Sequence, residues 1–336
     1  MKSAIVVGVV IALVAVILAL GAGDPTGPNA FVIIGLSQGA VFGLVALGLV
    51  LVYKGSRVFN FSQGEFGTIA AFLVFMMVEQ RFPTKVPYVA AAVIAIALTV
   101  LIGLIMERIV VRPLLNSPRV ILLVATIAFA LLAIGVEVLA FLPEAKSLPP
   151  MVTSIFGRES FEIFAFTLEP QRILILLVMG GMAAGLAYFF SKTDLGLAVL
   201  AISQDSFATR VVGIGVERMS RFIWGSAAFL GAVAGVLYVP LTVLTPGAMT
   251  TGVLIPAFTG AVIGGMTSLP GAFVGGIIVG LIGSLSNWAG GHYFIGDGVQ
   301  AKLLGDIIKG MPDVAVVLAL LIVLLARPQG LLGREA

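Results

Sequence analysis

The sequence predicts an all-α polytopic membrane protein. Of its 336 residues, 60% are apolar and only 10% are charged, whereas a soluble domain averages roughly 45–50% apolar and about 25% charged residues. The charges leave uninterrupted apolar stretches of about 20 residues, the length at which an α-helix crosses a bilayer. Too few charges remain to cover the surface of a soluble particle of this size. We therefore expect a bundle of transmembrane helices.

About ten transmembrane segments are predicted, including short or broken helices. The longest charge-free run, Phe222 to Gly296, has room for three segments, and Pro246-Gly247 and Pro270-Gly271 mark the breaks inside it. Short segments interrupted by Gly or Pro are typical of half-helices that line a cavity. In chain order the predicted segments are 4–22, 31–53, 61–78, 88–106, 120–142, 172–190, 222–244, 253–268, 270–287 and 312–326.

The first segment, 4–22, has two interpretations. Lys2 followed by an apolar run resembles a secretory signal peptide. As a helix, however, the run would extend about 32 Å and cross a bilayer, so we expect an uncleaved anchor. Cleavage would leave nine segments and an outside N-terminus.

The distribution of basic residues predicts the orientation. With Met1 inside and ten crossings, the C-terminus is also inside. Twelve Lys and Arg residues then lie on the inside and seven outside, while five acidic residues lie inside and nine outside. Cytoplasmic loops are rich in Lys and Arg, so this orientation is favoured. The proline-rich loop from Pro143 to Gln171 then lies outside, and the loop from Ser191 to Arg221 lies inside.

The inside loop is expected to contain a helix over 195–212. Thr193 can cap its N-terminus, Asp194 suits the positive end of the helix dipole, and Gly213 can terminate it. Such a helix can insert into a groove on another protein or lie on the membrane surface. The spacing alone leaves both interpretations open. A small apolar surface is formed by Ala198, Leu200, Ala201 and Ala208.

Glycines four residues apart recur in the predicted segments. In lipid, helices associate through close backbone contact across small residues. The pattern therefore predicts a tightly packed bundle, with a flexible hinge at one glycine as the alternative. The sets are Gly35, Gly39 and Gly43; Gly181 and Gly185; Gly231 and Gly235; Gly271 and Gly275; and Gly276 and Gly280.

Several classes of function are excluded by missing residues. The chain has no cysteine and one histidine, His292, so cysteine nucleophiles and histidine-based metal sites are not expected. It has no Gly-Lys dipeptide and thus no phosphate-binding loop for ATP. The basic residues are scattered rather than clustered as nucleic-acid binding requires. No nucleophile accompanies a base, so we expect no enzyme, no catalytic residues and no metal site.

Two acidic residues, Glu65 and Glu137, fall within the apolar segments. An ionisable residue inside a membrane indicates a functional site unless it has a structural role. Ser62 precedes Glu65 by three residues, the spacing of a capping box at a helix start. The stretch 60–66 is therefore expected to lead into a helix at membrane depth, with Glu65 closing the cap, lining a pathway, or both. Glu137, near the outer end of its segment, is interpreted as a membrane-interface residue.

Six short motifs in order give the chain a family resemblance. From about Phe31 to Arg334 it resembles the LivH-type permease subunits of branched-chain amino acid ABC transporters, members of the LivH/LivM family. Each motif is weak alone, but the ordered set is specific. The motifs are Asn60-Phe61-Ser62-Gln63-Gly64-Glu65; Arg112-Pro113-Leu114; Ala125-Thr126-Ile127; Thr193 to Ile214; Gly264-Gly265-Met266-Thr267-Ser268-Leu269-Pro270-Gly271-Ala272 with Gly275-Gly276; and Arg327-Pro328-Gln329-Gly330-Leu331-Leu332-Gly333-Arg334.

The resemblance implies a single transmembrane permease domain over 1–336, with an extra N-terminal span at 4–22, a family-like core at 31–334 and a cytoplasmic coupling segment at 193–214. It implies a multi-pass protein of the prokaryotic plasma (inner) membrane with a cytoplasmic C-terminus. The expected partners are a second, LivM-like permease, two ABC ATPase subunits, an extracytoplasmic solute-binding protein and the lipid bilayer, but no nucleic acid. This chain needs no cofactor, because the ATPase subunits bind ATP and Mg.

The resemblance also assigns roles to residues. The translocation pathway is expected to include Asn60, Gln63 and Glu65. Gln63 stands where the family commonly has histidine, and Leu200 and Leu197 replace a usual arginine and a frequently basic residue, which suggests a divergent ATPase partner. The ATPase-coupling residues are expected to be Thr193, Gly196, Ala198, Ala201, Asp205, Ala208 and Gly213.

The predicted function is therefore that of a membrane-spanning permease subunit of an ABC importer. It would translocate branched-chain amino acids or related small polar solutes, driven by ATP hydrolysis in partner subunits. The alternative is a secondary transporter or channel for small solutes that works without ATPase subunits. Scarce charge within the segments disfavours ion coupling, and the 193–214 segment disfavours a lone pore.

Overall fold

The computed structural model describes residues 28–80, 86–115, 117–141, 145–157, 161–163, 166–204, 209, 215–293, 311–327 and 329–333. Its helices are α2 (Pro28–Ser56), α3 (Gln63–Phe75), α4 (Tyr88–Met106), α5 (Arg119–Phe141), α6 (Met151–Phe156), α7 (Pro170–Lys192), α8 (Asp194–Gln204), α10 (Val216–Tyr238), α11 (Ile255–Gly264), α12 (Leu269–Tyr293) and α14 (Met311–Ala326). Turns of π- or 3₁₀-helix adjoin them: η1 (Met76–Gln80), η2 (Glu107–Val111), η3 (Arg112–Leu114), η4 (Val239–Leu241) and η5 (Thr250–Leu254).

Six helices in the described ranges are long and apolar enough to cross a membrane. They are Ala30–Ser56, Tyr88–Leu114, Arg119–Phe141, Pro170–Lys192, Val216–Leu241 and Leu269–Trp288, and Thr250–Gly264 and Pro312–Ala326 are shorter apolar helices. The all-α polytopic membrane class is confirmed at this level. The predicted total of about ten segments includes 4–22, which lies outside the described residues, so the total stays a prediction.

The predicted segment boundaries agree best with the observed helix boundaries where hydropathy alone defines the ends of a helix. The segment predicted over 88–106 coincides with α4, and α5 and α7 begin and end within two residues of the predictions. The segment predicted over 222–244 differs, because α10 begins at Val216, before the apolar run starts. Glu217 and Arg218 therefore belong to the helix rather than to a loop.

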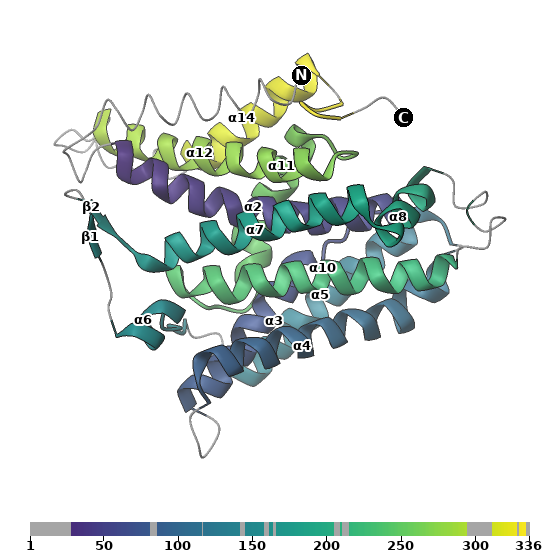
Figure 1. Cartoon of the computed structure of the whole chain (residues 1–336), viewed down its shortest axis with the longest axis horizontal. Coiled ribbons are helices and arrows are strands. Elements are labelled where there is room, and N and C mark those ends of the chain that lie inside the picture. The colour runs from purple at the N-terminus through teal and green to yellow at the C-terminus, as the bar shows by residue number, and fades with distance from the viewer. Residues whose placement is uncertain are drawn as a thin grey trace.

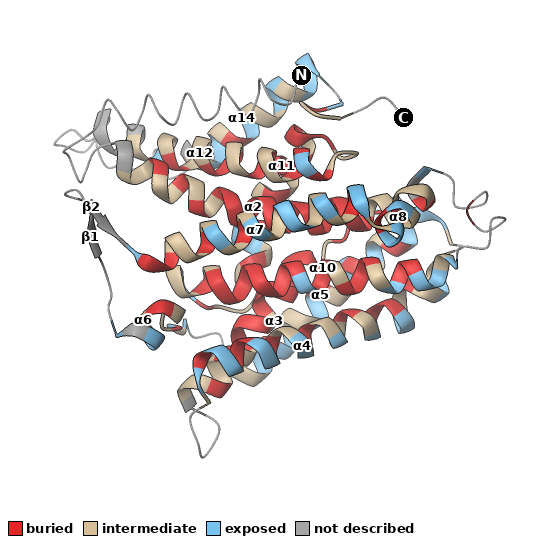
Figure 2. Ribbon diagram, viewed as in Figure 1, coloured by how far each residue is buried: buried red, intermediate tan, exposed pale blue. Residues whose placement is uncertain are grey.

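The helices α2 and α10 form the centre of the bundle. In Figure 1 the long helices run side by side, and α2 packs against α12, α11, α10 and α7, while α10 also packs against α3 and α4. Figure 2 shows buried residues concentrated on α2 and α10, whereas α7 has a large exposed share. Apolar side chains of α4, α5 and α14 that face outward, such as Val93, Leu131 and Leu325, are suited to contact lipid.

Glycine contacts join α2 to α12, the most extensive helix pair. A Cβ atom at Gly39 would lie 2.7 Å from the Ile277 Cα atom, and one at Gly43 would lie 2.7 Å from the Phe273 carbonyl oxygen. The predicted small-residue packing is thus confirmed at this interface. It is wrong for Gly181 and Gly185 on α7 within the described chain, because a Cβ at either position would meet no atom within 4 Å.

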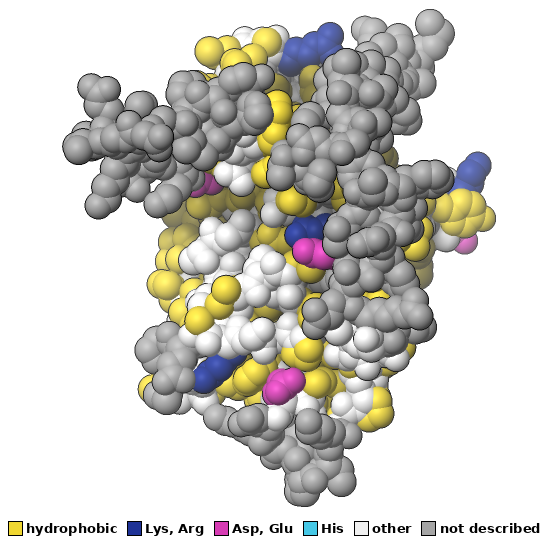
Figure 3. All heavy atoms as spheres, turned by 90° about the vertical axis from the view of Figure 1, so that its left-hand side faces the viewer, with side chains coloured by type: hydrophobic (Ala, Val, Ile, Leu, Met, Phe, Trp, Pro, Cys, Tyr) yellow, Lys and Arg dark blue, Asp and Glu magenta, His cyan; other side chains and the backbone are white. Residues whose placement is uncertain are grey.

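A short strand pair lies at the end of the bundle that also carries α6. Strands β1 (Phe161–Ile163) and β2 (Phe166–Leu168) pair antiparallel, and Lys146 forms an isolated bridge with Leu244. The loop predicted over 143–171 therefore has local structure that an all-α prediction omitted. Figure 3 faces this end, where the charged side chains of the described residues are few and a basic and an acidic side chain lie in contact.

Candidate functional site

The helix α3 begins inside the bundle rather than at its surface. A side chain at Gly48 of α2 would collide with the Gln63 amide, so the first residue of α3 lies level with Gly48. Gly48 precedes the last residue of α2, Ser56, by eight positions, which is about 12 Å along a helix. The stretch between the two helices therefore re-enters the bundle, as predicted for 60–66. Polar residues at the start of α3 thus lie inside the helix bundle, away from the end of α2.

Asn60 and Gln63, both predicted pathway residues, are fully buried and hydrogen-bonded to their neighbours. The Asn60 Nδ2 donates to Gln63 Oε1 at 3.2 Å. The Gln63 Nε2 donates to the Ala227 carbonyl oxygen of α10 at 2.9 Å. The backbone N–H of Phe61 donates to Thr126 Oγ1 of α5 at 3.2 Å. These bonds fix the re-entrant stretch between α10 and α5.

The predicted capping box of Ser62 and Glu65 is wrong. Ser62 Oγ donates to Asn60 Oδ1 at 2.5 Å, and the N-terminus of α3 has no side-chain cap hydrogen bond. Asn60, two residues away, competes successfully for the serine hydroxyl. Neither oxygen of the Glu65 carboxyl group has a hydrogen-bond partner, although the residue is completely buried. Glu65 therefore has no capping role.

Glu137 of α5 approaches Glu65. Both carboxyl groups meet at Gly247: the Gly247 N–H donates to Glu137 Oε2 at 3.0 Å, and a Cβ at Gly247 would lie 3.7 Å from Glu65 Oε1. Gly247 has a φ of 71°, a conformation that glycine adopts without a steric penalty. The interpretation of Glu137 as a membrane-interface residue is wrong, because it is only 4% exposed and faces Glu65.

Thr250 completes this cluster. Its hydroxyl oxygen is buried and has no hydrogen-bond partner, and the side chain faces the Glu65 carboxyl group. The chain around it is held in place, because the Met249 N–H donates to Thr68 Oγ1 of α3 at 3.1 Å. We call Glu65, Glu137 and Thr250 the carboxylate cluster. Sequence reasoning missed Thr250, since no spacing rule relates it to α3 or α5.

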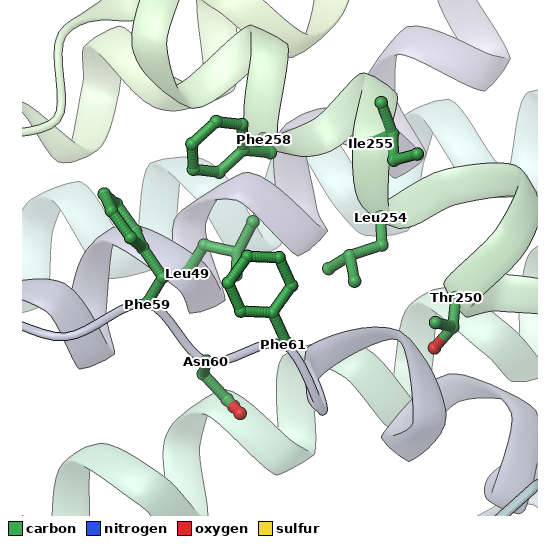
Figure 4. Close-up of a pocket in the computed structure, with 8 residues that line it drawn as sticks. All are labelled: Leu49, Phe59, Asn60, Phe61, Thr250, Leu254, Ile255 and Phe258. Atoms are coloured by element: carbon green, nitrogen blue, oxygen red, sulfur yellow. The ribbon is translucent and has the colours of Figure 1, made fainter. Parts of the chain in front are cut away.

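A pocket of about 290 Å³ adjoins the carboxylate cluster. Thr250 belongs to both, and Asn60 is the other polar residue in the lining. Figure 4 shows the apolar side chains grouped in the middle, with the Asn60 side chain directed away from the aromatic rings. The apolar lining residues are Leu49, Phe59, Phe61, Leu254, Ile255 and Phe258. The pocket thus presents an apolar wall with polar groups at its edge.

The helix α8 occupies the start of the predicted coupling segment. Thr193 caps it as predicted: the Gly196 N–H donates to Thr193 Oγ1 at 3.1 Å, and that hydroxyl donates to the Phe189 carbonyl oxygen at 2.7 Å. Asp194 lies in the first turn. The described part of the helix ends at Gln204, so Asp205, Ala208 and Gly213 lie outside the described residues.

The coupling candidates on α8 differ in exposure. Gly196 is buried, and a side chain there would collide with the Phe189 carbonyl group of α7. Ala198 and Ala201 are half-buried, while Leu195 and Leu197 are 48% and 53% exposed. The outward surface of α8 therefore includes two leucines that were not among the predicted coupling residues, together with the exposed polar residues Asp194 and Gln204.

The described residues contain no group of three or more His, Cys, Asp or Glu side chains arranged to hold a metal ion. The chemistry that the carboxylate cluster can perform is binding through oxygen acceptors. With the apolar pocket beside it, the site is suited to a small molecule that carries both a hydrogen-bond donor and an apolar part.

Comparison with known proteins places the chain in a family. The sequence pattern of the branched-chain amino acid transport system permease component matches residues 31–326. The high-affinity branched-chain amino acid transport system permease protein BraD of Pseudomonas aeruginosa is 31% identical over 310 residues, covering 89% of this chain and 94% of BraD. The corresponding LivH of Escherichia coli K12 is 28% identical over 308 residues, with the same coverage.

Two further similarities are more distant. The probable branched-chain amino acid transport permease protein LivH of Methanocaldococcus jannaschii is 28% identical over 253 residues, 72% of this chain and 76% of that protein. A chain of the solved structure of PsaBC from Streptococcus pneumoniae in complex with Fab aligns with 88% of this chain and 90% of its own length, at 15% identity and a TM-score of 0.40. The sequence matches confirm the LivH-type resemblance, and the chain belongs to the family of branched-chain amino acid transport system permease components.

Proposed function

We propose that this chain is the membrane-spanning permease subunit of an ABC importer that translocates branched-chain amino acids or related small polar solutes. One observation supports this function above others: a chain of this family has its helix α3 begin inside the bundle, beside a buried carboxylate cluster and a pocket sized for a small molecule. Broken helices at membrane depth are typical of transporter binding sites. As a family member with six long apolar helices, the chain is a multi-pass inner-membrane protein.

The pathway is proposed to pass the start of α3. Asn60 lines the pocket, and Gln63 holds the re-entrant stretch to α10 through the Ala227 carbonyl. These two residues act by positioning the site, because their polar groups are bonded within the protein. Glu65 has both oxygen atoms available, so it is proposed to contact the solute.

Energy is proposed to enter through the 193–214 segment. ATP and Mg are bound by two ABC ATPase subunits, and the outward surface of α8, with its exposed leucines, docks into one of them. Thr193 and Gly196 fix α8 against the end of α7, while Ala198, Ala201, Leu195 and Leu197 provide contact surface. Asp205, Ala208 and Gly213 complete the proposed coupling set.

The assembly is proposed to contain a second, LivM-like permease and an extracytoplasmic solute-binding protein. Residues 1–336 form one permease domain, with 4–22 as an added span, 31–334 as the core and a cytoplasmic C-terminus. The inward end is the one that carries α8, where the excess of basic residues lies.

Affinity purification of the tagged chain from its own host, in mild detergent, tests the assembly. The expected result is co-purification of two ATPase subunits and a second permease, and ATP-driven leucine uptake when the complex is reconstituted with its solute-binding protein. A complex that contains no ATPase would refute the importer.

A secondary transporter that works without ATPase subunits is the second candidate. The observation that favours it is the pair of carboxyl groups at membrane depth, since such pairs occur in ion-coupled transporters. Proteoliposomes distinguish the two functions: uptake driven by a Na⁺ or proton gradient without ATP supports the second candidate, and strict ATP dependence supports the importer.

A further inference from the structure

Four buried oxygen atoms of the carboxylate cluster lack hydrogen-bond partners. They are both carboxyl oxygens of Glu65, the Oε1 of Glu137 and the Oγ1 of Thr250. They come from three separate elements, α3, α5 and η5, and converge on one place. Buried polar atoms in native proteins are almost always bonded, so each exception requires an explanation. Four exceptions at one place indicate a missing donor.

The charge of that donor follows from its surroundings. Within the described residues, neither carboxyl group forms an ion pair, and the Gly247 N–H is the one N–H group bonded to the pair. Carboxylates buried in a membrane are costly unless a positive group accompanies them. Two carboxylates that face each other also repel when both are ionised. A group that carries positive charge and several N–H donors would relieve both costs.

The pocket beside the carboxylate cluster limits which molecule can carry this positively charged group. Thr250 borders the pocket and also faces the Glu65 carboxyl group, so its side chain lies between the pocket and the carboxylate cluster. The lining is otherwise formed by aliphatic and aromatic side chains, and Asn60 is already bonded to Ser62 and Gln63. The volume of about 290 Å³ is close to the lower limit of typical small-molecule sites, roughly 300 Å³. A short branched hydrocarbon fits this space.

We propose that Glu65 and Glu137 together bind the primary ammonium group of the transported solute, while the pocket binds its apolar side chain. An ammonium group has three donors and no acceptor, and Glu65, Glu137 and Thr250 each offer it an unpartnered oxygen. The site therefore selects a primary amine joined to an apolar chain. This inference rests on the proposed function and assigns a solute-binding role to Glu137 and Thr250.

Ligand stabilisation of the purified permease complex tests the inference directly, without the solute-binding protein. Four additions are compared at neutral pH: L-leucine, 3-methylbutylamine, 4-methylpentanoate and NaCl, with choline chloride as the ionic control. Ligands that bind the folded state raise its melting temperature. Leucine and 3-methylbutylamine are expected to raise it, because both present an ammonium group and a branched chain. The carboxylate and NaCl are expected to have no effect.

Matched glutamate variants locate the binding site. Glu65→Gln and Glu137→Gln each remove a negative charge with little change in shape, and we expect each to raise the apparent dissociation constant for 3-methylbutylamine about tenfold or more. Glu107→Gln is the control, because Glu107 is also completely buried with both oxygens unpartnered, but it lies in η2. The affinity of the Glu107→Gln variant for 3-methylbutylamine is expected to equal that of the unmodified chain. Melting temperatures without ligand show whether each variant is folded.

The outcomes separate this inference from the proposed function. Stabilisation by 4-methylpentanoate as strong as by the amine, stabilisation by NaCl alone, no amine-dependent shift, or unchanged amine affinity in both variants would each overturn the ammonium site. ATP-driven leucine uptake by the unmodified complex tests the proposed function separately. If ATP-driven leucine uptake persists and neither glutamate variant changes the amine affinity, the importer function stands and the proposed ammonium site is refuted.

Discussion

Thr126 and Thr99 are buried threonines in apolar helices, but their hydroxyl groups differ in bonding. Thr126 Oγ1 accepts the Phe61 N–H and donates to the Leu123 carbonyl oxygen at 2.8 Å. Thr99 Oγ1 is buried without a partner. The two threonines therefore form a matched pair: the Thr126 hydroxyl is bonded to the re-entrant stretch, and the Thr99 hydroxyl is not hydrogen-bonded.

Thr126→Val is expected to lower the free energy of unfolding by about 1–3 kcal/mol, because it leaves the Phe61 N–H without its acceptor. Thr99→Val is expected to be neutral or stabilising, within about 0.5 kcal/mol, because no hydrogen bond is lost. Denaturation in mixed micelles measures both values. Equal losses in the two variants would show that the Thr126 bond does not anchor the stretch before α3.

At the scale of elements, the glycine interface between α2 and α12 leads to a second comparison. A Cβ added at Gly39 would lie 2.7 Å from the Ile277 Cα atom, whereas one at Gly181 would meet nothing within 4 Å. Gly39→Ala is therefore expected to destabilise the chain by about 1–3 kcal/mol, since backbone must move. Gly181→Ala should preserve the melting temperature. Thermal unfolding of the purified chain measures both, and tolerance of Gly39→Ala would contradict the close contact.

Leu197 lies on the outward surface of α8 that is proposed to dock into an ATPase. Leu197→Glu places a charge on the outward surface without disturbing the buried side of the helix, where Val199 and Ile202 pack. If α8 docks into an ATPase, ATP-driven uptake should fall about tenfold or more while the amount of protein in the membrane is unchanged. Ser191→Gln, an exposed change just before α8, is the control. Full uptake by Leu197→Glu would argue that this surface does not transmit energy.

At the scale of the whole molecule, α6 and α8 lie at opposite ends of the bundle in Figure 1. Ser154 of α6 and Ser191 at the end of α7 are both exposed. The natural chain has no cysteine, so a single introduced cysteine can be labelled without a background. The orientation inferred from basic residues is therefore open to a direct measurement.

In intact spheroplasts, a membrane-impermeant maleimide is expected to label Ser154→Cys but not Ser191→Cys. The reason is that the excess of Lys and Arg at the α8 end predicts a cytoplasmic location for this end. Permeabilised cells provide the control, since both variants should then react. Labelling in the reverse order would invert the topology and place the proposed coupling surface outside.

The class of the protein and most helix boundaries could be predicted from the sequence, because both depend on local hydropathy. The agreement of 88–106 with α4 is one case. The cap of α8 by Thr193 is another, because that bond joins residues three positions apart. The same local reasoning was wrong for Ser62, whose hydroxyl had two possible partners of similar sequence separation.

By itself, then, the sequence determined a multi-pass helical permease with two glutamates within its apolar segments and a helix capped by Thr193. Only the tertiary structure decided that Glu65 meets Glu137 at Gly247, that Thr250 joins them to a pocket, and that Gly39 is packed while Gly181 is not. The physical reason is separation along the chain. Hydropathy and capping act over a few residues, whereas these contacts join helices whose relative positions are set by packing of the whole bundle.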